Sequence, residues 1–317
     1  MISLGYAAIN KTLRDINIYT NRTITLKKIK GLEQLEQLAL KNIADLKTII
    51  EWNEEHGIRF YRLSSALFPH LDNIKLDNQL NYSVEFAKDK LKEIGEFCRK
   101  NSHRITMHPP QFLQLGSPNE TVVTNSIVSL TQHVNILEAM GLTPEMGTCL
   151  ILHGGGTYGN KQTAIERWKN IYKNLNHRIR QYIVLENDEW NYSVADLLPI
   201  CEELNIPFCL DIFHNSISND RIKITKSLIR RVFNTWRVSE PKMHYSQQDP
   251  TLRKGAHSKT VTKIPKWLLL LPQTMKINRL DIMLEVKDKE LSVLKIYNKF
   301  FHKTFVKGKL IYVLNVF

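Results

Sequence analysis

Cysteine is scarce in this 317-residue chain, and its spacing carries no motif. The four cysteines are Cys98, Cys149, Cys201 and Cys209, and no two of them form a Cys-x-x-Cys pair. That absence excludes a zinc ribbon and a thioredoxin-like redox motif. Cys149 and Cys209 lie inside apolar runs, which predicts small core residues. A reducing, intracellular compartment fits this usage better than a secretory one, and a bacterial cytoplasm, a nucleus and a viral particle all stay open.

Long apolar runs and nucleotide-binding glycine loops are missing too. No segment approaches about 20 uninterrupted apolar residues, so we expect no transmembrane helix. Residues 1–6 lack a basic region and a long apolar region, which favours a first strand over a signal peptide. A doubly wound nucleotide-binding sheet would show a glycine-rich turn after Gly5, and it does not. The glycine run at 154–156 lacks the Lys-Ser/Thr of a phosphate loop.

Acidic residues are outnumbered by basic ones. Lys and Arg total 44 against 31 Asp and Glu, which gives a formal net charge of +13. Such a surplus predicts a polyanionic partner, with nucleic acid first and an anionic membrane surface second. A codon bias toward Lys, Asn and Ile is the alternative source of the charge.

Eight short apolar runs alternate with helical patterns along the chain. The runs lie at 2–6, 59–63, 104–108, 149–153, 182–186, 208–211, 242–245 and 282–286. The helical patterns lie near 31–56, 82–100, 120–140, 161–179, 194–204, 222–236, 263–270 and 288–300. Asn119 and Ser193 are predicted helix starts. Eight strand–helix repeats predict a (β/α)8 TIM barrel, in a single domain over 1–317. We expect 301–317 to be a tail or a packed extension.

Ionisable residues gather where the predicted strands end. His, Glu or Asp stands at or just after the end of six of the eight runs, namely at His108, His153, Glu186, Asp211, His214, His244 and Glu285. In a TIM barrel these positions converge on the C-terminal face, where active sites are built. Each residue alone is explained as well by a hydrogen-bonded loop or a helix cap, but one shared cause explains the set better. Imidazoles mixed with carboxylates favour Mn, Zn, Fe or Co, and this many ligands implies two or three ions, a cluster suited to phosphoryl hydrolysis.

Several polar residues accompany these predicted ligands. Gln111 and Phe112 follow the third run, where an amide and a ring could contact a base, or where the ring could simply anchor the loop. Tyr6 and Asn10 follow the first run and could reach the same face, or serve ordinary turns. Lys242 and His244 are two residues apart, so both point to the same side of their strand. A lysine that faces a barrel interior is costly unless it pairs with a phosphate or is modified.

These residues resemble the UV damage endonucleases over nearly the whole chain, from Tyr6 to about Lys289. The matching stretches in this sequence are YRLSS at 61–65, HPPQF at 108–112, HGGGTYGNK at 153–161, LEND at 185–188, Asp211 with His214, KMH at 242–244, Ala256-His257 and MLEVK at 283–287. Two of them are long and specific, and all occur in the order that the family shows.

The resemblance implies a fold similar to xylose isomerase and an enzyme that nicks DNA immediately 5′ to UV photoproducts and other lesions. It implies a cluster of divalent ions, typically Mn²⁺, with Mg²⁺, Co²⁺ or Zn²⁺ as other candidates, and a monomer acting on double-stranded DNA. The seven strand-end residues above would be its ligands. Glu186, Lys242, His244 and His257 would serve catalysis, and the lysine is sometimes carboxylated in the family. Lesion contacts would fall on Tyr6, Asn10, Gln111 and Phe112.

Two departures from the family pattern bear on the site. Many members carry a histidine where this chain has Asn73, so His70 could replace it from a shifted loop, or a third metal could be held differently. The family often shows two adjacent histidines after the sixth strand, and here the first is Phe213 while His214 remains. Lys287 closes the last matching stretch and has no assigned role.

Two other functions fit the same barrel. A metal-dependent sugar or sugar-phosphate isomerase or epimerase would use a similar His, Glu and Asp face, but small sugars need no basic groove and no Gln-aromatic loop. A protein that marks lesions without cutting them would be expected to lose its ligands, and this ligand set is nearly complete.

Overall fold

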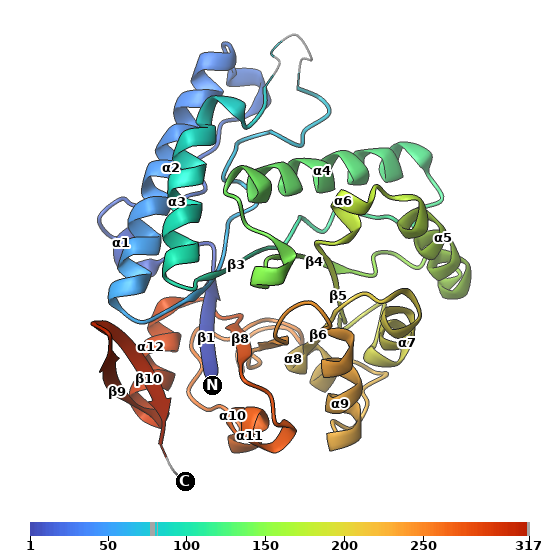
Figure 1. The fold of residues 1–317 in the computed structure, drawn as a ribbon. Coiled ribbons are helices and arrows are strands. Elements are labelled where there is room, and N and C mark those ends of the chain that lie inside the picture. Colours follow the sequence, from blue (N-terminus) through green and yellow to red (C-terminus); the bar gives the residue numbers. More distant parts are fainter. Residues whose placement is uncertain (77–79, 81, 316–317) are drawn as a thin grey trace.

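A closed barrel of eight parallel strands forms the centre of the molecule (Figure 1). The computed structural model describes residues 1–76, 80 and 82–315. The barrel strands are β1 (Ile2–Ala7), β2 (Phe60–Arg62), β3 (Arg104–Met107), β4 (Cys149–His153), β5 (Ile183–Glu186), β6 (Phe208–Asp211), β7 (Lys242–Tyr245) and β8 (Leu280–Leu284). They pair in chain order, and β1 pairs with β8 from Ile2↔Leu280 to Gly5↔Met283 to close the ring. The predicted TIM barrel is therefore confirmed.

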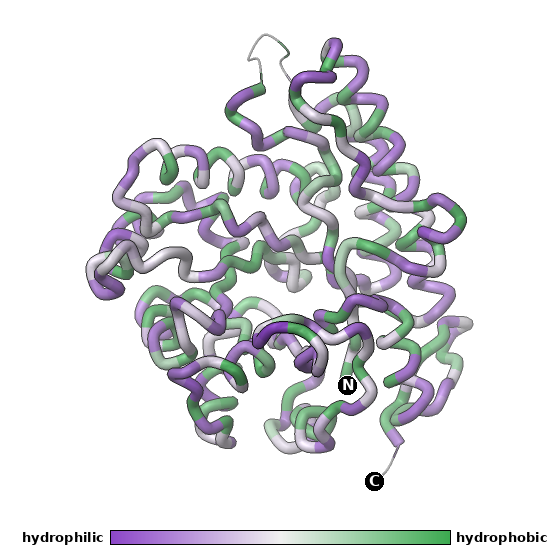
Figure 2. Tube along the Cα trace, turned by 180° about the vertical axis from the view of Figure 1, so that it is seen from behind, coloured by the Kyte–Doolittle hydropathy of each residue, from purple (hydrophilic) through white to green (hydrophobic). Residues whose placement is uncertain are grey.

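Helices surround the barrel between successive strands (Figure 1). They are α1 (Lys11–Arg14), α2 (Leu32–Glu55), α3 (Lys88–Lys100), α4 (Glu120–Ala139), α5 (Lys161–Asn174), α6 (His177–Arg180), α7 (Val194–Leu204), α8 (Ile212–Ile217), α9 (Lys226–Thr235), α10 (Lys266–Leu269), α11 (Leu271–Met275) and α12 (Glu290–Phe300), with 3-10 turns at Leu26–Lys28, Glu85–Ala87 and Pro144–Met146. Hydrophilic and hydrophobic stretches alternate along the helices (Figure 2), because one face of each helix packs on the barrel and the other faces water.

The predicted helix starts at Asn119 and Ser193 are confirmed. The Asn119 side chain accepts a hydrogen bond from the Thr121 backbone N–H at 2.9 Å, and Ser193 is the N-cap of α7, where the Asp196 carboxylate accepts from its backbone N–H at 2.8 Å. Such caps satisfy amide groups that have no partner within the first turn of the helix.

Several predicted boundaries are wrong. The helix expected at 161–179 is two helices, because Leu175 takes an extended backbone conformation, and the one expected at 263–270 is the two short helices α10 and α11. The helix expected at 222–236 starts at Lys226, after a cap by Thr225. Strand β8 lies two residues earlier than expected, so Glu285 follows the strand instead of lying within it.

Close packing inside the barrel requires a glycine at one position in β1. A Cβ atom on Gly5 would lie 2.5 Å from the carbonyl oxygen of Phe60 in the neighbouring strand and 2.6 Å from its ring. The glycine therefore makes room for the Phe60 side chain, which fills the barrel beside the fully buried Lys242. Cys149 and Cys209 are buried free thiols, as predicted for core residues.

The segment after α12 is a two-stranded antiparallel hairpin, formed by β9 (Phe301–Val306) and β10 (Lys309–Leu314). Its turn places Lys307 and Gly308 at φ 51° and 77°, which suits a two-residue hairpin loop. The ring of Tyr312 stacks on Tyr297 of α12 with centroids 3.9 Å apart, and Leu310 accepts a hydrogen bond from Arg59 at 2.8 Å. The hairpin thus packs against α12 and contacts Arg59, which directly precedes β2.

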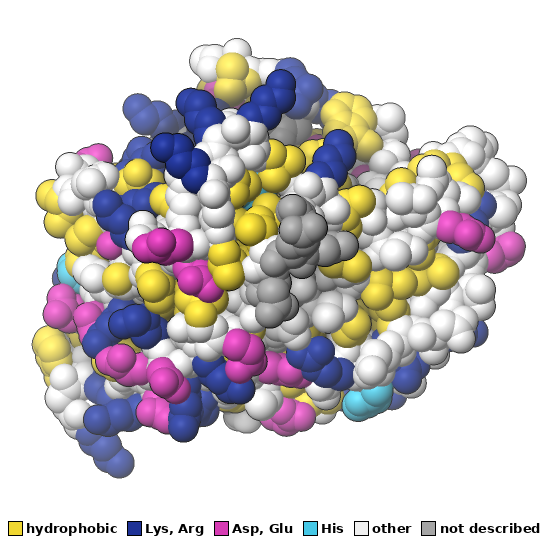
Figure 3. Space-filling view, turned by 90° about the horizontal axis from the view of Figure 1, so that it is seen from above, with side chains coloured by type: hydrophobic (Ala, Val, Ile, Leu, Met, Phe, Trp, Pro, Cys, Tyr) yellow, Lys and Arg dark blue, Asp and Glu magenta, His cyan; other side chains and the backbone are white. Residues whose placement is uncertain are grey.

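The face seen from above mixes basic, acidic and apolar side chains (Figure 3). The basic surplus is therefore not gathered into one patch on that face. None of the helices in the described part of the chain has the length and apolar character needed to cross a membrane.

Candidate metal centre

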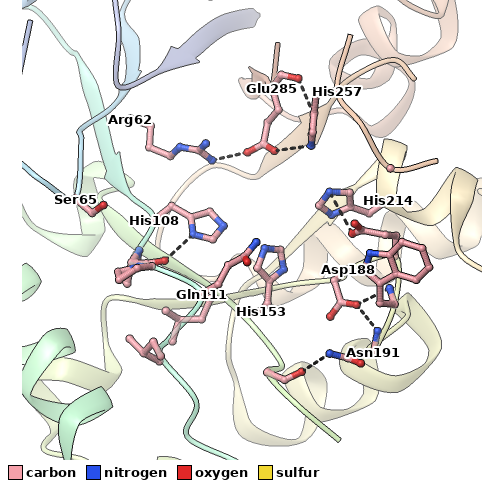
Figure 4. Close-up of a pocket in the computed structure, with 18 of the residues that line it drawn as sticks. Arg62, Ser65, His108, Gln111, His153, Asp188, Asn191, His214, His257 and Glu285 are labelled. Carbon is pink, nitrogen blue, oxygen red and sulfur yellow. Dashed lines mark hydrogen bonds and ion pairs between the residues drawn. The ribbon is translucent and has the colours of Figure 1, made fainter. Parts of the chain in front are cut away.

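The strand ends of the barrel open into a cavity of about 750 Å³. Its lining comes from the loops that follow β1 to β8, with Arg62, Gln111 and Arg253 among the polar side chains. Figure 4 shows His108, His153, His214, His257 and Glu285 pointing into this cavity from positions at or after the ends of different strands. The structure therefore brings together side chains that are up to 177 residues apart in the sequence.

Glu186, at the end of β5, is the centre of the cluster. Its side chain is 1% exposed, and its Oε2 lies 3.3 Å from Nε2 of His108 and 3.9 Å from Nε2 of His153. Burial raises the pKa of Glu186 well above its usual value, and the charges of Glu285 and Asp211 raise it further. Burial also lowers the pKa values of His108 and His153. Neutral imidazoles have a free lone pair, which is the form that binds metals.

Asp211 and His214 are held together by α8, a short helix that the sequence analysis did not predict. Asp211 caps the helix, and its Oδ1 accepts the His214 backbone N–H at 2.7 Å. Burial lowers the pKa of His214, but the charges of Asp211, Glu186, Glu285 and Glu189 outweigh it and raise that pKa to about 10. In the absence of a metal, His214 is therefore a cation that partly balances the carboxylates.

Glu285 is paired with Arg62, a residue that the sequence analysis left without a role. The Arg62 guanidinium donates to Oε1 of Glu285, and Oε2 lies 3.9 Å from Nε2 of His257. Burial would raise the pKa of Glu285, but Arg62, His244 and His257 hold it well below its usual value. Arg62 comes from the end of β2, where no predicted ligand stands, and a single arginine in an apolar run gave no signal.

His244 lies where the three carboxylates converge. Its Nδ1 donates a hydrogen bond to Glu186, and the same atom lies 3.3 Å from Oε1 of Glu285 and 3.9 Å from Oδ2 of Asp211. Burial lowers the pKa of His244 well below its usual value, so it adds little positive charge. Three acidic side chains therefore share one nearly neutral imidazole.

The donor set fits divalent metal ions. Among the described residues, Oε2 of Glu186, Oδ2 of Asp211 and Nε2 of His244 are buried without a hydrogen-bond partner. Buried polar atoms rarely lack partners, so these atoms are suited to ligation. Sets of three residues can each place ligand atoms within 4.8 Å of one another: His108, His153 and Glu186; Glu186, Asp211 and His214; Asp211, His244 and Glu285; His214, His257 and Glu285; Glu186, Cys209 and His244.

Lys242 lies fully buried inside the barrel, on the strand that carries His244. Its Nζ has no hydrogen-bond partner among the described residues and lies 5.6 Å from the centroid of the Phe60 ring. Burial lowers its pKa. The predicted inward orientation is thus present, while its predicted role in catalysis remains a hypothesis.

The predicted lesion contacts are divided by the structure. Gln111 lines the cavity, and Phe112 is 87% exposed beside an adjoining hollow. Tyr6 and Asn10 are fully buried instead: the Asn10 amide donates to the Tyr6 hydroxyl at 3.0 Å, and that hydroxyl donates to Asn53 at 2.7 Å. In this structure, Tyr6 and Asn10 support the start of α1 and do not reach the cavity.

The two candidates for the role of the missing histidine, His70 and Asn73, lie outside the cavity in this structure. His70 donates from Nε2 to the carbonyl of Ile24, and the Asn73 amide donates to its Nδ1 at 3.1 Å. Both residues line the adjoining hollow and not the cavity that holds the cluster. Phe213 packs on His257 with ring centroids 5.1 Å apart, and Lys287 pairs with Asp249 at 3.3 Å.

Comparisons with known proteins agree with this geometry. The chain is 50% identical to a putative UV-damage endonuclease of Acanthamoeba polyphaga mimivirus, over 99% of this chain and 96% of that protein. It is 37% identical to the UV-damage endonuclease of Schizosaccharomyces pombe, over 94% of this chain but only 50% of that longer protein. The crystal structure of SacUVDE superposes with a TM-score of 0.81 at 32% identity, covering 93% of this chain and 96% of that one. The family described as UV-endonuclease UvdE matches residues 2–310, and the chain belongs to that family.

Proposed function

We propose that this protein is a metal-dependent DNA-repair endonuclease that nicks the strand immediately 5′ to UV photoproducts and other lesions. The observation that carries the proposal is the convergence of Glu186, Asp211 and Glu285 on one imidazole nitrogen of His244. Membership of the UvdE family supports the substrate class. We further propose that the protein acts as a monomer on double-stranded DNA.

The metal ligands in this proposal are His108, His153, Glu186, Asp211, His214, His244 and Glu285. These residues would hold divalent ions, with Mn²⁺ favoured by the imidazole-rich set, and the bound ions would supply an activated water and neutralise charge on the phosphate. The protein's own part is to fix the ligands: α8 orients His214 through Asp211, and Arg62 orients Glu285. In this proposal Lys242 serves catalysis from the buried interior of the barrel, either as an amine or in carboxylated form.

His257 is placed to handle a proton at the cavity wall. Its Nδ1 donates to the Glu285 carbonyl at 2.8 Å, next to the Ser246 hydroxyl at 2.9 Å. This contact leaves Nε2 facing the cavity, 3.9 Å from the Glu285 carboxylate. An imidazole fixed in this way can accept a proton from a water, or return one to a leaving oxygen.

Gln111 and Phe112 contact the lesion in this proposal. An extruded base leaves a gap in the duplex, and the Gln111 amide can bond the orphaned base while the Phe112 ring stacks on it. Neither side chain is a ligand, so replacing both by alanine should narrow the preference for damaged duplex and leave bound metal unchanged.

The decisive experiment is nicking of UV-irradiated and unirradiated plasmid, with Mn²⁺, with Mg²⁺ and with EDTA. We expect nicking of irradiated plasmid, faster with Mn²⁺ than with Mg²⁺ and abolished by EDTA. Full nicking in EDTA would contradict the metal mechanism. Binding of irradiated DNA without nicking would favour a lesion marker, and neither binding nor nicking would favour the sugar isomerase.

A further inference from the structure

One large aromatic side chain at the mouth of the cavity makes no ring contact with the described residues. Trp190 is 69% exposed and lies in the loop between β5 and α7. Among the described residues that line the cavity, it is the one with an indole or benzene ring. We propose that Trp190 is a stacking residue that binds an unstacked nucleobase of the DNA at the mouth of the cavity. This inference rests on the proposed function and adds a recognition residue to it.

The loop under Trp190 is held by its own hydrogen bonds. Oδ1 of Asp188 accepts the Trp190 backbone N–H at 2.8 Å, and the Asp188 N–H donates to the Tyr192 carbonyl at 2.9 Å. The Asn191 amide donates to the Gly155 carbonyl at 2.9 Å, and the Tyr192 hydroxyl donates to that of Gly156 at 3.1 Å. The backbone is thus held by hydrogen bonds before and after Trp190, whose own side chain stays exposed. Because the backbone is already fixed, a ligand that stacks on the ring has to order only the Trp190 side chain.

The loop that carries Trp190 borders the candidate metal centre. Glu189, the preceding residue, has its Oε2 3.6 Å from Nε2 of the predicted ligand His214. In Figure 4, Asp188 and Asn191 lie on one side of the cavity, and His108 and Gln111 lie on the other. Trp190 therefore belongs to the wall opposite the predicted lesion-contacting loop.

Charge decides what this wall can bind. Asp188 and Glu189 flank the indole on its N-terminal side and line the cavity with it, so a phosphate at this point would meet two carboxylates. The face of a base is uncharged, and base–aromatic stacking tolerates any base. Arg253, also in the cavity lining, offers a cation for a phosphate of the DNA backbone. A nucleobase, and not a phosphate, is the group that fits against Trp190.

The test is binding of a UV-damaged duplex to the full chain in a Glu186→Gln background, so that the DNA stays intact. Trp190→Ala and Trp190→Leu should each weaken binding by about 10-fold, since stacking contributes roughly 1–3 kcal/mol per base. Trp190→Phe should recover most of the affinity because it keeps a ring. Trp267→Ala is the matched control: Trp267 is 41% exposed on α10, outside the cavity lining.

Tryptophan fluorescence gives a second readout. Damaged duplex should quench the emission of the parent protein, and Trp190→Phe should remove most of that quenching, whereas Trp267→Phe should not. Melting temperature should be unchanged in all these variants, and metal content should be unchanged when the same replacements are made in the chain that keeps Glu186, because the replaced rings are exposed.

Three outcomes would each overturn the inference. They are an affinity of Trp190→Ala equal to that of the parent, quenching that persists in Trp190→Phe, and an affinity of Trp190→Leu equal to that of the parent. The proposed function fails separately, if the unmodified protein does not nick irradiated plasmid. Nicking by the unmodified protein together with normal binding by Trp190→Ala would remove only the role of Trp190.

Discussion

The two ends of the barrel differ in how far their buried charged side chains are paired. At the N-terminal ends of the strands, Arg104 and Arg279 both pair with Asp281, at 2.8 and 2.6 Å, and all three side chains are mostly buried. Arg104 also donates to the backbone carbonyls of Gly147 and Glu240. At the C-terminal ends, Glu186, Asp211 and Glu285 lie close together with Arg62 and the cationic His214, and two of the carboxylates keep an oxygen without a hydrogen bond among the described residues.

The difference shows which charges serve the fold and which serve a ligand. A buried ion is costly unless opposite charges and hydrogen bonds balance it. At the N-terminal end each of the three charged groups is paired within the chain, so we expect them to serve stability, although Nη2 of Arg104 and of Arg279 has no hydrogen-bond partner among the described residues. The C-terminal end is balanced only in part, so a bound cation would stabilise it. This matches the general division of TIM barrels into a functional face and a stability face.

The largest effect we expect comes from the unbalanced end. Glu186→Gln keeps the shape of the side chain and removes the charge at the centre of the cluster. Loss of metal would remove the activated water, so nicking should fall on the order of 100-fold or more. Initial rates on irradiated plasmid with added Mn²⁺, together with metal content, measure this. Glu166→Gln, on the exposed face of α5, is the matched control. A near-normal rate for Glu186→Gln would show that the carboxylates at the C-terminal end are not needed for activity.

A change at the balanced end should lower stability instead of activity. Arg104→Met keeps the apolar stem and leaves Asp281 with Arg279 alone. We expect a loss of roughly 3 kcal/mol in the free energy of unfolding, at the low end of the cost of breaking a buried ion pair, because one partner remains. Urea unfolding measures this loss, while nicking per folded molecule and metal content should not change. A selective loss of metal in this variant would show that the two ends are coupled.

Metal binding should stabilise only through the C-terminal end. Mn²⁺ at 100 times its dissociation constant should raise the free energy of unfolding by about 2.7 kcal/mol. The same increment is expected for Arg104→Met, and almost none for Glu186→Gln. Thermal unfolding with Mn²⁺ and with EDTA makes the comparison. An equal rise in all three proteins would place the stabilising ion elsewhere.

The smallest effect concerns Glu54, a second paired charge at the N-terminal end. Burial raises its pKa, but the hydrogen bonds from His103 and Arg59 outweigh burial and lower that pKa to about 2. Because the folded pKa lies below the usual 4.5, the stabilisation is complete above about pH 4.5 and is lost as the pH falls toward 2. After allowance for solvent screening, we expect it to amount to roughly 1–2 kcal/mol.

Urea unfolding of the parent protein and Glu54→Gln, at pH 7 and at pH 3, isolates this contribution. The two proteins should differ more at pH 7 than at pH 3. If the two free energies of unfolding differ equally at both pH values, the ionised Glu54 carboxylate does not contribute to stability.

The sequence predicted the barrel and the positions of seven clustered side chains, because six of the eight apolar runs carry an ionisable residue at or just after the same end, which one shared cause explains better than six separate ones. It could not predict α8, since six residues give too short a period to recognise, nor the extended break at Leu175. It also placed Tyr6 and Asn10 after the first strand, whereas Tyr6 lies within β1 and both side chains are buried: the Asn10 amide donates to the Tyr6 hydroxyl, which donates to Asn53. Trp190 carried no signal, because exposure of an aromatic side chain is a property of the folded surface.

The pairing of β1 with β8 also sets an order in time. Strand β1 leaves the ribosome first, yet its partner residues, from Leu280 to Met283, are made last among the barrel strands. At about 5–20 residues per second, β1 waits for tens of seconds with one edge unpaired. Glu285 follows β8 directly, so the last acidic residue of the cluster arrives together with the closing strand. The nascent chain therefore cannot assemble the metal centre that we propose before the barrel itself is closed.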